Sequence, residues 1–304
     1  MVIAEYTCIA TAASIRIVPH HSENTMLLGY NTNGLAHHDL LDAIEIIAEI
    51  GYASVAVTID HHALNPYGER LEEQLARLKT KLRNKGMRSV IETGARFLLD
   101  PRIKHEPTLM DPDGDGRARR IDFYRRCIDI ADRLGSDCVS VWSGTLREAV
   151  SEEKAFARLA EALGQVLDYA VRRGVTVGFE PEPGMFIDTM ERFDRLLGRL
   201  DTPYFQLTLD VGHLHCAGET PVADRIVAWG HRIVNVHIED MRKGVHEHLM
   251  FGEGEMEFPP IIEALAEIGY RGGLHVELSR HSHDGVSAAK RAYEFLQPLI
   301  PETG

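Results

Sequence analysis

The sequence predicts a single α/β domain with the (β/α)8 TIM-barrel fold. Short β-branched runs recur along the chain, segments with apolar residues at helical spacing lie between them, and no Gly-rich phosphate turn follows an early run. The runs start roughly 25–50 residues apart, which is the length of one βα unit. Eight such units fit a chain of 304 residues, because these barrels usually take about 250. A doubly wound open sheet is the alternative, but it normally carries the Gly-rich turn.

The expected strands are the runs at residues 26–32, 54–60, 88–94, 138–144, 175–181, 205–212, 232–240 and 273–279. Helical periodicity predicts helices that include residues 37–52, 153–174, 259–272 and 286–300. A glycine often marks the end of such a segment. The domain is expected to span residues 1–304, with residues 1–25 as an N-terminal extension that is an extra strand, a flexible leader or a misassigned start.

Composition narrows the class of protein. Hydrophobic residues make up 44% and charged residues 26% of the chain, as in ordinary globular proteins, and no apolar run is long enough to span a membrane. A net charge of −13 disfavours nucleic acid as a partner. Cys8, Cys127, Cys138 and Cys216 form no CxxC pair, which indicates reduced thiols in the cytoplasm. The expected partner is a small molecule, and the oligomeric state stays open, a homo-oligomer included.

Four strand ends carry an ionisable residue. Glu180 closes "VTVGFE", Asp210 closes "FQLTLD", His237 lies in "IVNVHI" and Glu277 in "GLHVEL". Side chains alternate across a strand, so each of the four falls on the face opposite to the branched apolar residues, which suit packing against helices. All four therefore point into the barrel at its C-terminal end, where barrel enzymes place their chemistry.

Adjacent strands lie about 4.8 Å apart, so these four side chains are expected to meet over the barrel mouth. Three carboxylates brought together with a histidine repel one another unless a cation lies among them. Mixed oxygen and imidazole ligands suit Zn²⁺, Mn²⁺, Co²⁺ or Fe²⁺ better than Ca²⁺. Separate solvated residues at the strand ends are the structural alternative.

Glu180, Asp210 with His213, His237 in "HIED" and Glu277 resemble the metal site of the xylose isomerase-like TIM barrels. That superfamily contains sugar and sugar phosphate isomerases and epimerases, inositol-catabolic isomerases and dehydratases, and endonucleases of the endonuclease IV type. The run "VHIEDM…HLMFGEGEMEF" is most similar to the isomerase/epimerase branch. The resemblance implies that Glu180, Asp210, His237 and Glu277 hold one divalent ion (Mn, Zn, Mg or Co), and that His213 binds substrate or a neighbouring metal.

The chain departs from two branches of this superfamily. Ketose 3-epimerases carry a glutamate where this chain has Phe186 and an arginine where it has Lys243, which disfavours a free-ketose epimerase of that kind. Endonuclease IV relatives use further histidines on earlier strands, but here Trp142 occupies the end of the fourth strand. The nuclease interpretation is weakened accordingly.

Other residues are candidates for contacting the substrate. We expect Trp142, His62, Glu92 and His248 to line the pocket, since they end strands two to four or follow strand seven. Glu182 is the rival of Glu180 as a ligand, but the prolines on either side of Glu182 end the strand before it.

The stretch "DPDGDGRARRID" (residues 111–122) partly matches a calcium loop. Its last position holds Asp122 rather than the usual glutamate, and no helix is expected to enter it. A solvated, turn-rich loop is the preferred interpretation.

These observations predict an isomerase or epimerase of a sugar, sugar phosphate or cyclitol that depends on a divalent metal. A metal polarises the substrate carbonyl, and Glu180 and Glu277 remove and return a proton through an enediolate. Loss of a β-hydroxyl instead would make the protein a dehydratase of a keto-inositol or related hydroxy-ketone. A phosphodiesterase of the endonuclease IV type and a barrel that only binds metabolites are the remaining alternatives.

Overall fold

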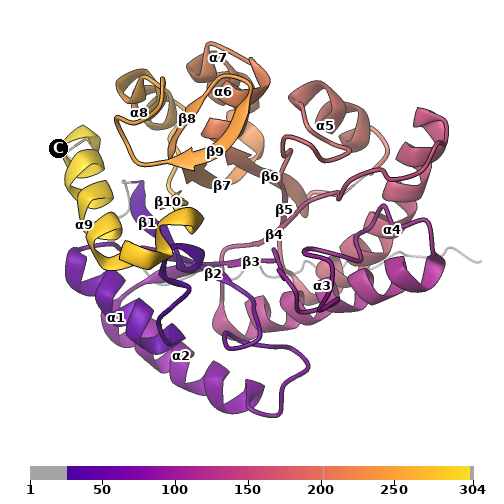
Figure 1. Ribbon diagram of the computed structural model, residues 1–304, viewed down its shortest axis with the longest axis horizontal. Coiled ribbons are helices and arrows are strands. Elements are labelled where there is room, and N and C mark those ends of the chain that lie inside the picture. The colour runs from indigo at the N-terminus through magenta and orange to yellow at the C-terminus, as the bar shows by residue number, and fades with distance from the viewer. Residues whose placement is uncertain (1–25, 201, 302–304) are drawn as a thin grey trace, which may run out of the picture.

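The computed structural model describes residues 26–200 and 202–301, which form a closed barrel of eight parallel strands surrounded by helices (Figure 1). Around the barrel the strands follow in the order β1-β10-β7-β6-β5-β4-β3-β2, and pairing of β1 with β10 closes it. The barrel strands are β1 Leu27–Asn31, β2 Ser54–Thr58, β3 Arg88–Glu92, β4 Val139–Val141, β5 Val177–Phe179, β6 Phe205–Asp210, β7 Ile233–Ile238 and β10 Gly273–Val276. The predicted fold class is confirmed. The predicted extension at residues 1–25 lies outside the described residues.

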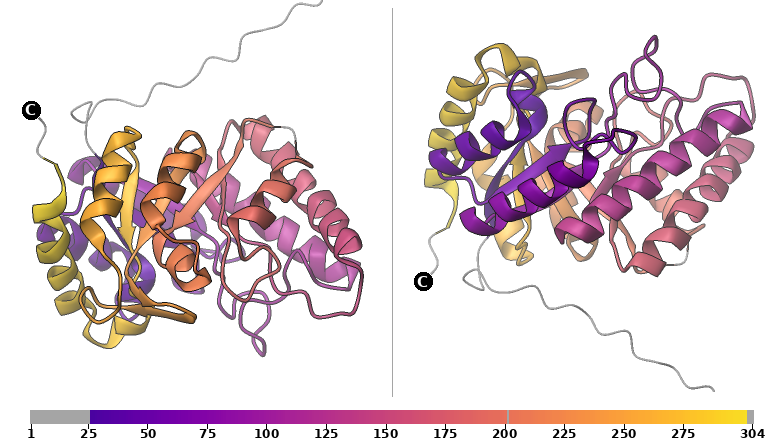
Figure 2. Two further views of the ribbon diagram at one scale, coloured as in Figure 1. Left: turned by 90° about the horizontal axis from the view of Figure 1, so that it is seen from above. Right: turned by 90° about the horizontal axis from the view of Figure 1, so that it is seen from below.

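The helices cover the outside of the barrel, as Figure 2 shows from above and below. The α-helices are α1 Leu40–Ile50, α2 Leu71–Lys85, α3 Gly114–Leu134, α4 Glu152–Arg173, α5 Met190–Leu197, α6 Val211–Ala217, α7 Val222–Trp229, α8 Phe258–Glu267 and α9 Gly285–Leu296. Short 3-10 helices occur at η1 Thr32–Leu35, η2 Gly230–Arg232, η3 Ser279–Asp284 and η4 Gln297–Leu299. The four helices expected from periodicity are all present. No helix in the described part of the chain combines the length and apolar character that crossing a membrane requires.

The alternation of side chains along the strands separates two environments. Phe179 of β5 faces outward and packs against Phe193 of α5 and Phe205, with ring centroids 5.9 and 5.8 Å apart. Gly178, next to it, faces inward, where a Cβ would collide with the hydroxyl of Thr208. The branched apolar set therefore packs on the helices and the inward set fills the barrel, as the strand patterns predict.

Hydrogen bonds between polar side chains run through the barrel interior toward its C-terminal end. The His275 Nδ1 lies 2.8 Å from Asn235 Oδ1, and its Nε2 lies 2.9 Å from the Ser54 hydroxyl. Asn235 in turn donates to Glu92 Oε1 over 3.0 Å. A side chain at Gly29 would collide with the His275 ring. Because these buried polar groups satisfy one another, they hold the inward side chains in fixed positions.

A two-stranded antiparallel hairpin follows β7 and was not expected from the sequence. It consists of β8 Asp240–Arg242 and β9 Val245–Leu249, and Figure 1 shows it in orange beside β7. The Asp240 carboxylate accepts backbone N–H groups of Gly252, Gly254 and Met256, so it fixes the return of the chain toward α8. The predicted loop after strand seven is therefore ordered by one buried carboxylate.

The stretch at residues 111–122 is not a turn-rich loop over its whole length, and in that respect the expectation was wrong. Helix α3 begins at Gly114, and the Asp113 side chain caps it by accepting from the Asp115 N–H. Asp111 accepts from the Asp113 N–H over 2.8 Å. Asp122 lies two turns into the helix and pairs with Arg126. Asp113 therefore caps a helix N-terminus, where acidic groups are stabilising. Asp122 lies inside the helix, so it does not occupy the last position of a calcium-binding loop.

Arg120 of α3 fixes the long loop between β3 and α3. Its side chain is fully buried, and its guanidinium donates to the carbonyls of Pro107, Thr93 and His105 over 2.7, 3.3 and 2.6 Å. The guanidinium also lies 5.0 Å from the centre of the Trp142 ring. The planar, multi-donor shape of arginine suits this bridging position, which lysine could not fill.

We expect Arg120→Met to lower the free energy of unfolding by about 3–5 kcal/mol, since it leaves buried carbonyls without donors. Arg83→Met, a change at an exposed arginine of α2, should shift it by less than about 0.5 kcal/mol. Chemical denaturation of both variants measures the difference. Equal stabilities of the two variants would show that the loop does not depend on Arg120.

Candidate active site

A cavity of about 480 Å³ opens over the barrel mouth. It lies among the C-terminal ends of the strands and the loops that follow them, which is the end where TIM-barrel enzymes act. Its lining includes Asn31, Asn33, Thr58, Glu92, Arg96, Lys104, His105, Trp142, Glu180, Glu182, Met185, His213, His237, His246, His248, Glu277 and Arg280. The cavity thus combines acidic, basic, imidazole and aromatic side chains.

The four residues predicted as metal ligands lie together. One ligand atom from each of Glu180, Asp210, His237 and Glu277 lies within 4.8 Å of the others. Asp210 ends β6 directly beside His237 of β7 in the barrel register, while Glu180 and Glu277 follow β5 and β10. The rival carboxylate, Glu182, lines the cavity but is outside this group.

His237 lies at the centre of the group. Its Nδ1 is 3.1 Å from Glu180 Oε1 and 3.0 Å from Glu277 Oε2, and its Nε2 is 2.9 Å from Glu92 Oε1. A carboxylate that holds the far nitrogen of a histidine is the usual support for a metal-binding imidazole. Glu92 therefore orients His237, in addition to lining the cavity as predicted.

The carboxylates and His237 shift one another's pKa values. Burial raises the pKa of Glu180 to about 8, although the charge of His237 opposes that shift. Burial also acts to raise the pKa of Glu277, but the charge and hydrogen bond of His237 hold it below its ordinary value. Burial lowers the pKa of His237, while the charges of Glu92, Glu180 and Glu277 raise it well above the ordinary range. The cluster consequently stabilises positive charge at its centre.

The donor set fits a divalent cation. Asp210 is 2% exposed, and its Oδ2 atom has no hydrogen-bond partner among the described residues. An unpaired buried carboxylate oxygen is costly unless it binds a cation. Three carboxylates and one imidazole are ligands that Zn²⁺, Mn²⁺ and Co²⁺ accept. The residues present therefore fit such an ion.

The residues predicted to contact substrate are mostly at the cavity. Glu92, Trp142, His213 and His248 line it. His62 does not: it is exposed and lines a smaller pocket beside the cavity. The reason is local, since His62 lies in a tight turn after β2 that is closed by pairing of Asp60 with Ala63.

Several residues that line the cavity were not predicted from the sequence. Arg96, Lys104 and His105 come from the β3–α3 loop, and Arg280 from η3. Asn33 of η1 donates to Glu277 Oε1 over 2.8 Å. None of these residues ends a strand, so strand patterns could not single them out. The unusual length of the β3–α3 loop was the available signal for the first three.

The two departures from the ketose 3-epimerase pattern have structural roles away from the cavity lining. Phe186 is buried and packs against Phe156 of α4, with ring centroids 4.9 Å apart. Lys243 is exposed at the turn of the β8–β9 hairpin, near Gly218. Neither residue takes the place of the absent glutamate or arginine at the cavity.

Comparison with curated proteins finds sugar phosphate epimerases. The chain is 24% identical over 271 residues to L-ribulose-5-phosphate 3-epimerase UlaE of Escherichia coli, an alignment that covers 87% of this chain and 91% of that protein. The corresponding protein of Escherichia coli O157:H7 matches with the same identity and coverage. These relatives are epimerases, and the match runs through most of both chains.

Solved structures share the fold at low identity. A D-allulose 3-epimerase from Methylomonas sp. superimposes with a TM-score of 0.72 at 20% identity, over 91% of this chain and 98% of that one. An IolI protein with a bound zinc atom gives a TM-score of 0.74 at 18% identity, over 90% and 98% of the two chains.

A model of the family described as xylose isomerase-like TIM barrel matches residues 44–299. This span contains Glu180, Asp210, His237 and Glu277 together with seven of the eight barrel strands. The chain belongs to the xylose isomerase-like TIM barrel family.

Proposed function

We propose that this protein is a divalent-metal-dependent isomerase or epimerase of a sugar, sugar phosphate or cyclitol. The observation that carries the proposal is the convergence of Glu180, Asp210, His237 and Glu277 at the mouth of the barrel, within one cavity. The epimerase names of the curated relatives support the same reaction class.

Two carboxylates in this site are placed for proton transfer. Glu180 and Glu277 both line the cavity, and both lie within 3.1 Å of His237 Nδ1. A divalent ion at this site, when bound, polarises the carbonyl of the substrate and acidifies the adjacent C–H. One carboxylate then removes the proton to give an enediolate, and the other returns it. Return to the other face of the same carbon gives epimerisation, and return to the neighbouring carbon gives isomerisation.

Supporting residues orient the two carboxylates. Asn33 donates to Glu277 Oε1, which directs the other oxygen toward His237. Glu92 holds the far nitrogen of His237, so the ring cannot rotate away from Glu180 and Glu277. Such fixed geometry is what makes a positioned base effective.

The basic residues of the cavity favour a substrate with an anionic group. Arg96 and Lys104 come from the β3–α3 loop and Arg280 from η3, and all three line the same cavity as the carboxylates. The molecule as a whole carries a net charge of −13, so cationic side chains gathered here point to a local function. A ketose phosphate suits this lining, and the absence of the ketose 3-epimerase glutamate and arginine also disfavours a free ketose.

A dehydratase of a keto-inositol or related hydroxy-ketone uses the same first step and is the second candidate. It differs only in the fate of the enediolate, which loses a β-hydroxyl. The two carboxylates serve either outcome, because the departing hydroxyl also needs a proton. A nuclease is disfavoured because Trp142 lies at the end of β4, where a metal-binding histidine is expected.

Deuterium incorporation tests the proposal. We expect the metal-loaded protein in deuterated water to exchange a C–H of at least one member of a panel of ketoses, ketose phosphates and keto-inositols. A new stereoisomer or positional isomer identifies the isomerase or epimerase, and a product lighter by one water identifies the dehydratase. Cleavage of an abasic oligonucleotide without exchange on any panel member would contradict the proposal.

A further inference from the structure

Glu182 is an acidic side chain of the cavity that the proposed reaction leaves without a role. It lies in the turn after β5, two residues beyond Glu180, and it lines the cavity. The carboxylate site, which consists of Glu180, Asp210, His237 and Glu277, does not include it. Among the described residues, none forms a hydrogen bond or an ion pair with its carboxylate. The two carboxylate oxygens are therefore free to accept from a ligand.

The turn that carries Glu182 is held rigidly by its own backbone. Prolines flank the residue on both sides, and each proline fixes one backbone angle. The Glu182 N–H donates to the Ile187 carbonyl over 3.1 Å, and the Met185 N–H donates to the Glu182 carbonyl over 3.0 Å. Gly184 adopts a φ of 86°, which permits the sharp reversal of the chain. The side chain of Glu182 thus starts from a fixed point.

The loop after β4 holds the same turn from one side. The Phe186 N–H donates to the Gly144 carbonyl over 2.9 Å, and the Ile187 N–H donates to the Ser143 hydroxyl over 3.1 Å. Gly144 has a φ of 89°, and a Cβ there would collide with Thr108. Two neighbouring loops consequently fix the position from which Glu182 enters the cavity.

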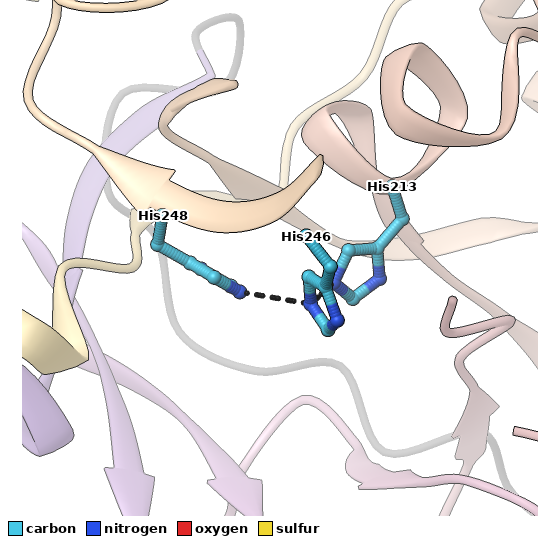
Figure 3. A group of neighbouring side chains, drawn as sticks. All are labelled: His213, His246 and His248. Carbon is cyan, nitrogen blue, oxygen red and sulfur yellow. Dashed lines mark hydrogen bonds between the residues drawn. The ribbon is translucent and has the colours of Figure 1, made fainter. Parts of the chain in front are cut away.

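Helix α6 holds the turn from the other side. His213 Nδ1 lies 3.2 Å from the Pro181 carbonyl oxygen, and because a carbonyl only accepts, this nitrogen donates. Figure 3 shows the ring of His213 in a three-histidine group with His246 and His248 of β9. His213 Nε2 is 3.0 Å from His246 Nε2. The hairpin therefore supports the ring that holds the residue before Glu182.

The position is unfavourable for a carboxylate unless a ligand uses it. The charges of three carboxylates of the carboxylate site act against that of Glu182, and Lys104 offsets part of this repulsion without forming an ion pair with it. Residues that serve binding are often placed at the expense of stability. A rigid turn that presents an unpaired carboxylate to a cavity already rich in carboxylates indicates such a residue.

The wall beside this turn indicates the kind of ligand. Trp142 ends β4 and lines the cavity, and the Glu180 N–H donates to the Val141 carbonyl over 2.8 Å, so the indole lies on the same side of the cavity as Glu182. An aromatic face packs against the C–H groups of a sugar. A carboxylate accepts strong hydrogen bonds from its hydroxyl groups. The two side chains together suit a polyol.

We propose that Glu182 is a specificity-determining residue whose carboxylate accepts hydrogen bonds from hydroxyl groups of the substrate. Its oxygens lie outside the group of ligand atoms at the carboxylate site, so it contacts a part of the substrate that proton transfer does not change. The inference rests on the proposed function for the identity of the ligand as a sugar, sugar phosphate or cyclitol. Its effect is on the affinity for that ligand.

Saturation-transfer NMR with the zinc-loaded full-length protein and the panel of ketoses, ketose phosphates and keto-inositols tests the proposal. We expect Glu182→Ala to weaken binding of the panel member that the wild type binds most tightly by about 10–100-fold, the effect of losing hydrogen bonds to a charged group. Glu182→Gln keeps one accepting oxygen and should weaken binding less. Glu263→Gln, at an exposed glutamate of α8, should bind within about twofold of the wild type.

Monodeoxy analogues of the same panel member separate direct contact from an indirect effect. One analogue should bind to the wild type about as weakly as the parent compound binds to Glu182→Ala. The same analogue should lose little further affinity in Glu182→Ala, because the hydroxyl and its acceptor act as a pair. Equal losses for every analogue in wild type and variant would show that Glu182 contacts no hydroxyl, and would overturn the proposal.

Melting of the metal-free proteins gives a reading that needs no ligand. Glu182→Gln relieves repulsion among carboxylates, so it should melt at the same temperature as the wild type or higher. A lower melting temperature with unchanged binding would overturn the proposal, because it would assign Glu182 to the fold.

The outcomes also separate this proposal from the proposed reaction. Weaker binding by Glu182→Ala without deuterium exchange in the wild type would contradict the reaction and support the role of Glu182. Exchange in the wild type with equal affinities of wild type and Glu182→Ala would overturn the role of Glu182 alone. Absence of binding to every panel member would overturn both.

Discussion

Glu277→Gln should reduce deuterium exchange into the substrate by at least about 10⁴-fold. Loss of a positioned base alone costs roughly 10²–10⁴-fold, and the same change removes a charged member of the group around His237. The side chains are similar in shape, and the amide oxygen can still accept from Asn33 at the Oε1 position. Mass spectrometry of a substrate identified from the panel, incubated with equal amounts of the two proteins, measures the ratio of exchange rates.

Matched variants separate this effect from a general loss of charge. Glu263→Gln replaces an exposed glutamate on α8 and should leave exchange within about twofold of the wild type. The exchange rate of Glu180→Gln should fall as steeply as that of Glu277→Gln, because each variant lacks one of the two carboxylates beside His237 Nδ1. Undiminished exchange in both site variants would rule out the two-carboxylate mechanism.

Asp210→Asn should remove the divalent ion from the carboxylate site without unfolding the protein. Asp210 has two roles. Its Oδ1 caps α6 by accepting from the His213 N–H over 2.8 Å, while its Oδ2 has no hydrogen-bond partner among the described residues and lies 3.4 Å from His213 Nε2. Asparagine keeps a capping oxygen but removes the charge that binds a cation. Metal analysis after dialysis should show one equivalent fewer than in the wild type.

Asp210→Ala provides the comparison for this prediction. It removes both the ligand and the cap, so it should lose the same ion and in addition lower the free energy of unfolding by about 0.5–2 kcal/mol relative to Asp210→Asn. Thermal melting of the two metal-free variants isolates the cap from the ion. Metal content equal to that of the wild type in both variants would show that Asp210 is not a ligand.

The sequence by itself determined the barrel and the central group of the site. Alternation with period two shows which residues of a strand share a face, and parallel strands bring their C-terminal ends to one rim. Those two rules were enough to predict that Glu180, Asp210, His237 and Glu277 meet, although they lie far apart in the chain. The regular backbone geometry of strands decides which side chains meet, so the meeting of these four residues can be predicted without knowing the conformation of the loops.

Only the tertiary structure decided what the loops contribute. The Asp240 carboxylate orders the hairpin that brings His246 beside His213, Arg120 holds the β3–α3 loop that supplies Lys104, and a tight turn carries His62, which does not line the cavity. Loops have no repeating geometry, so their side-chain directions depend on single contacts between residues distant in sequence. Strand periodicity therefore predicted the carboxylate site, whereas the three-histidine group required the packed molecule.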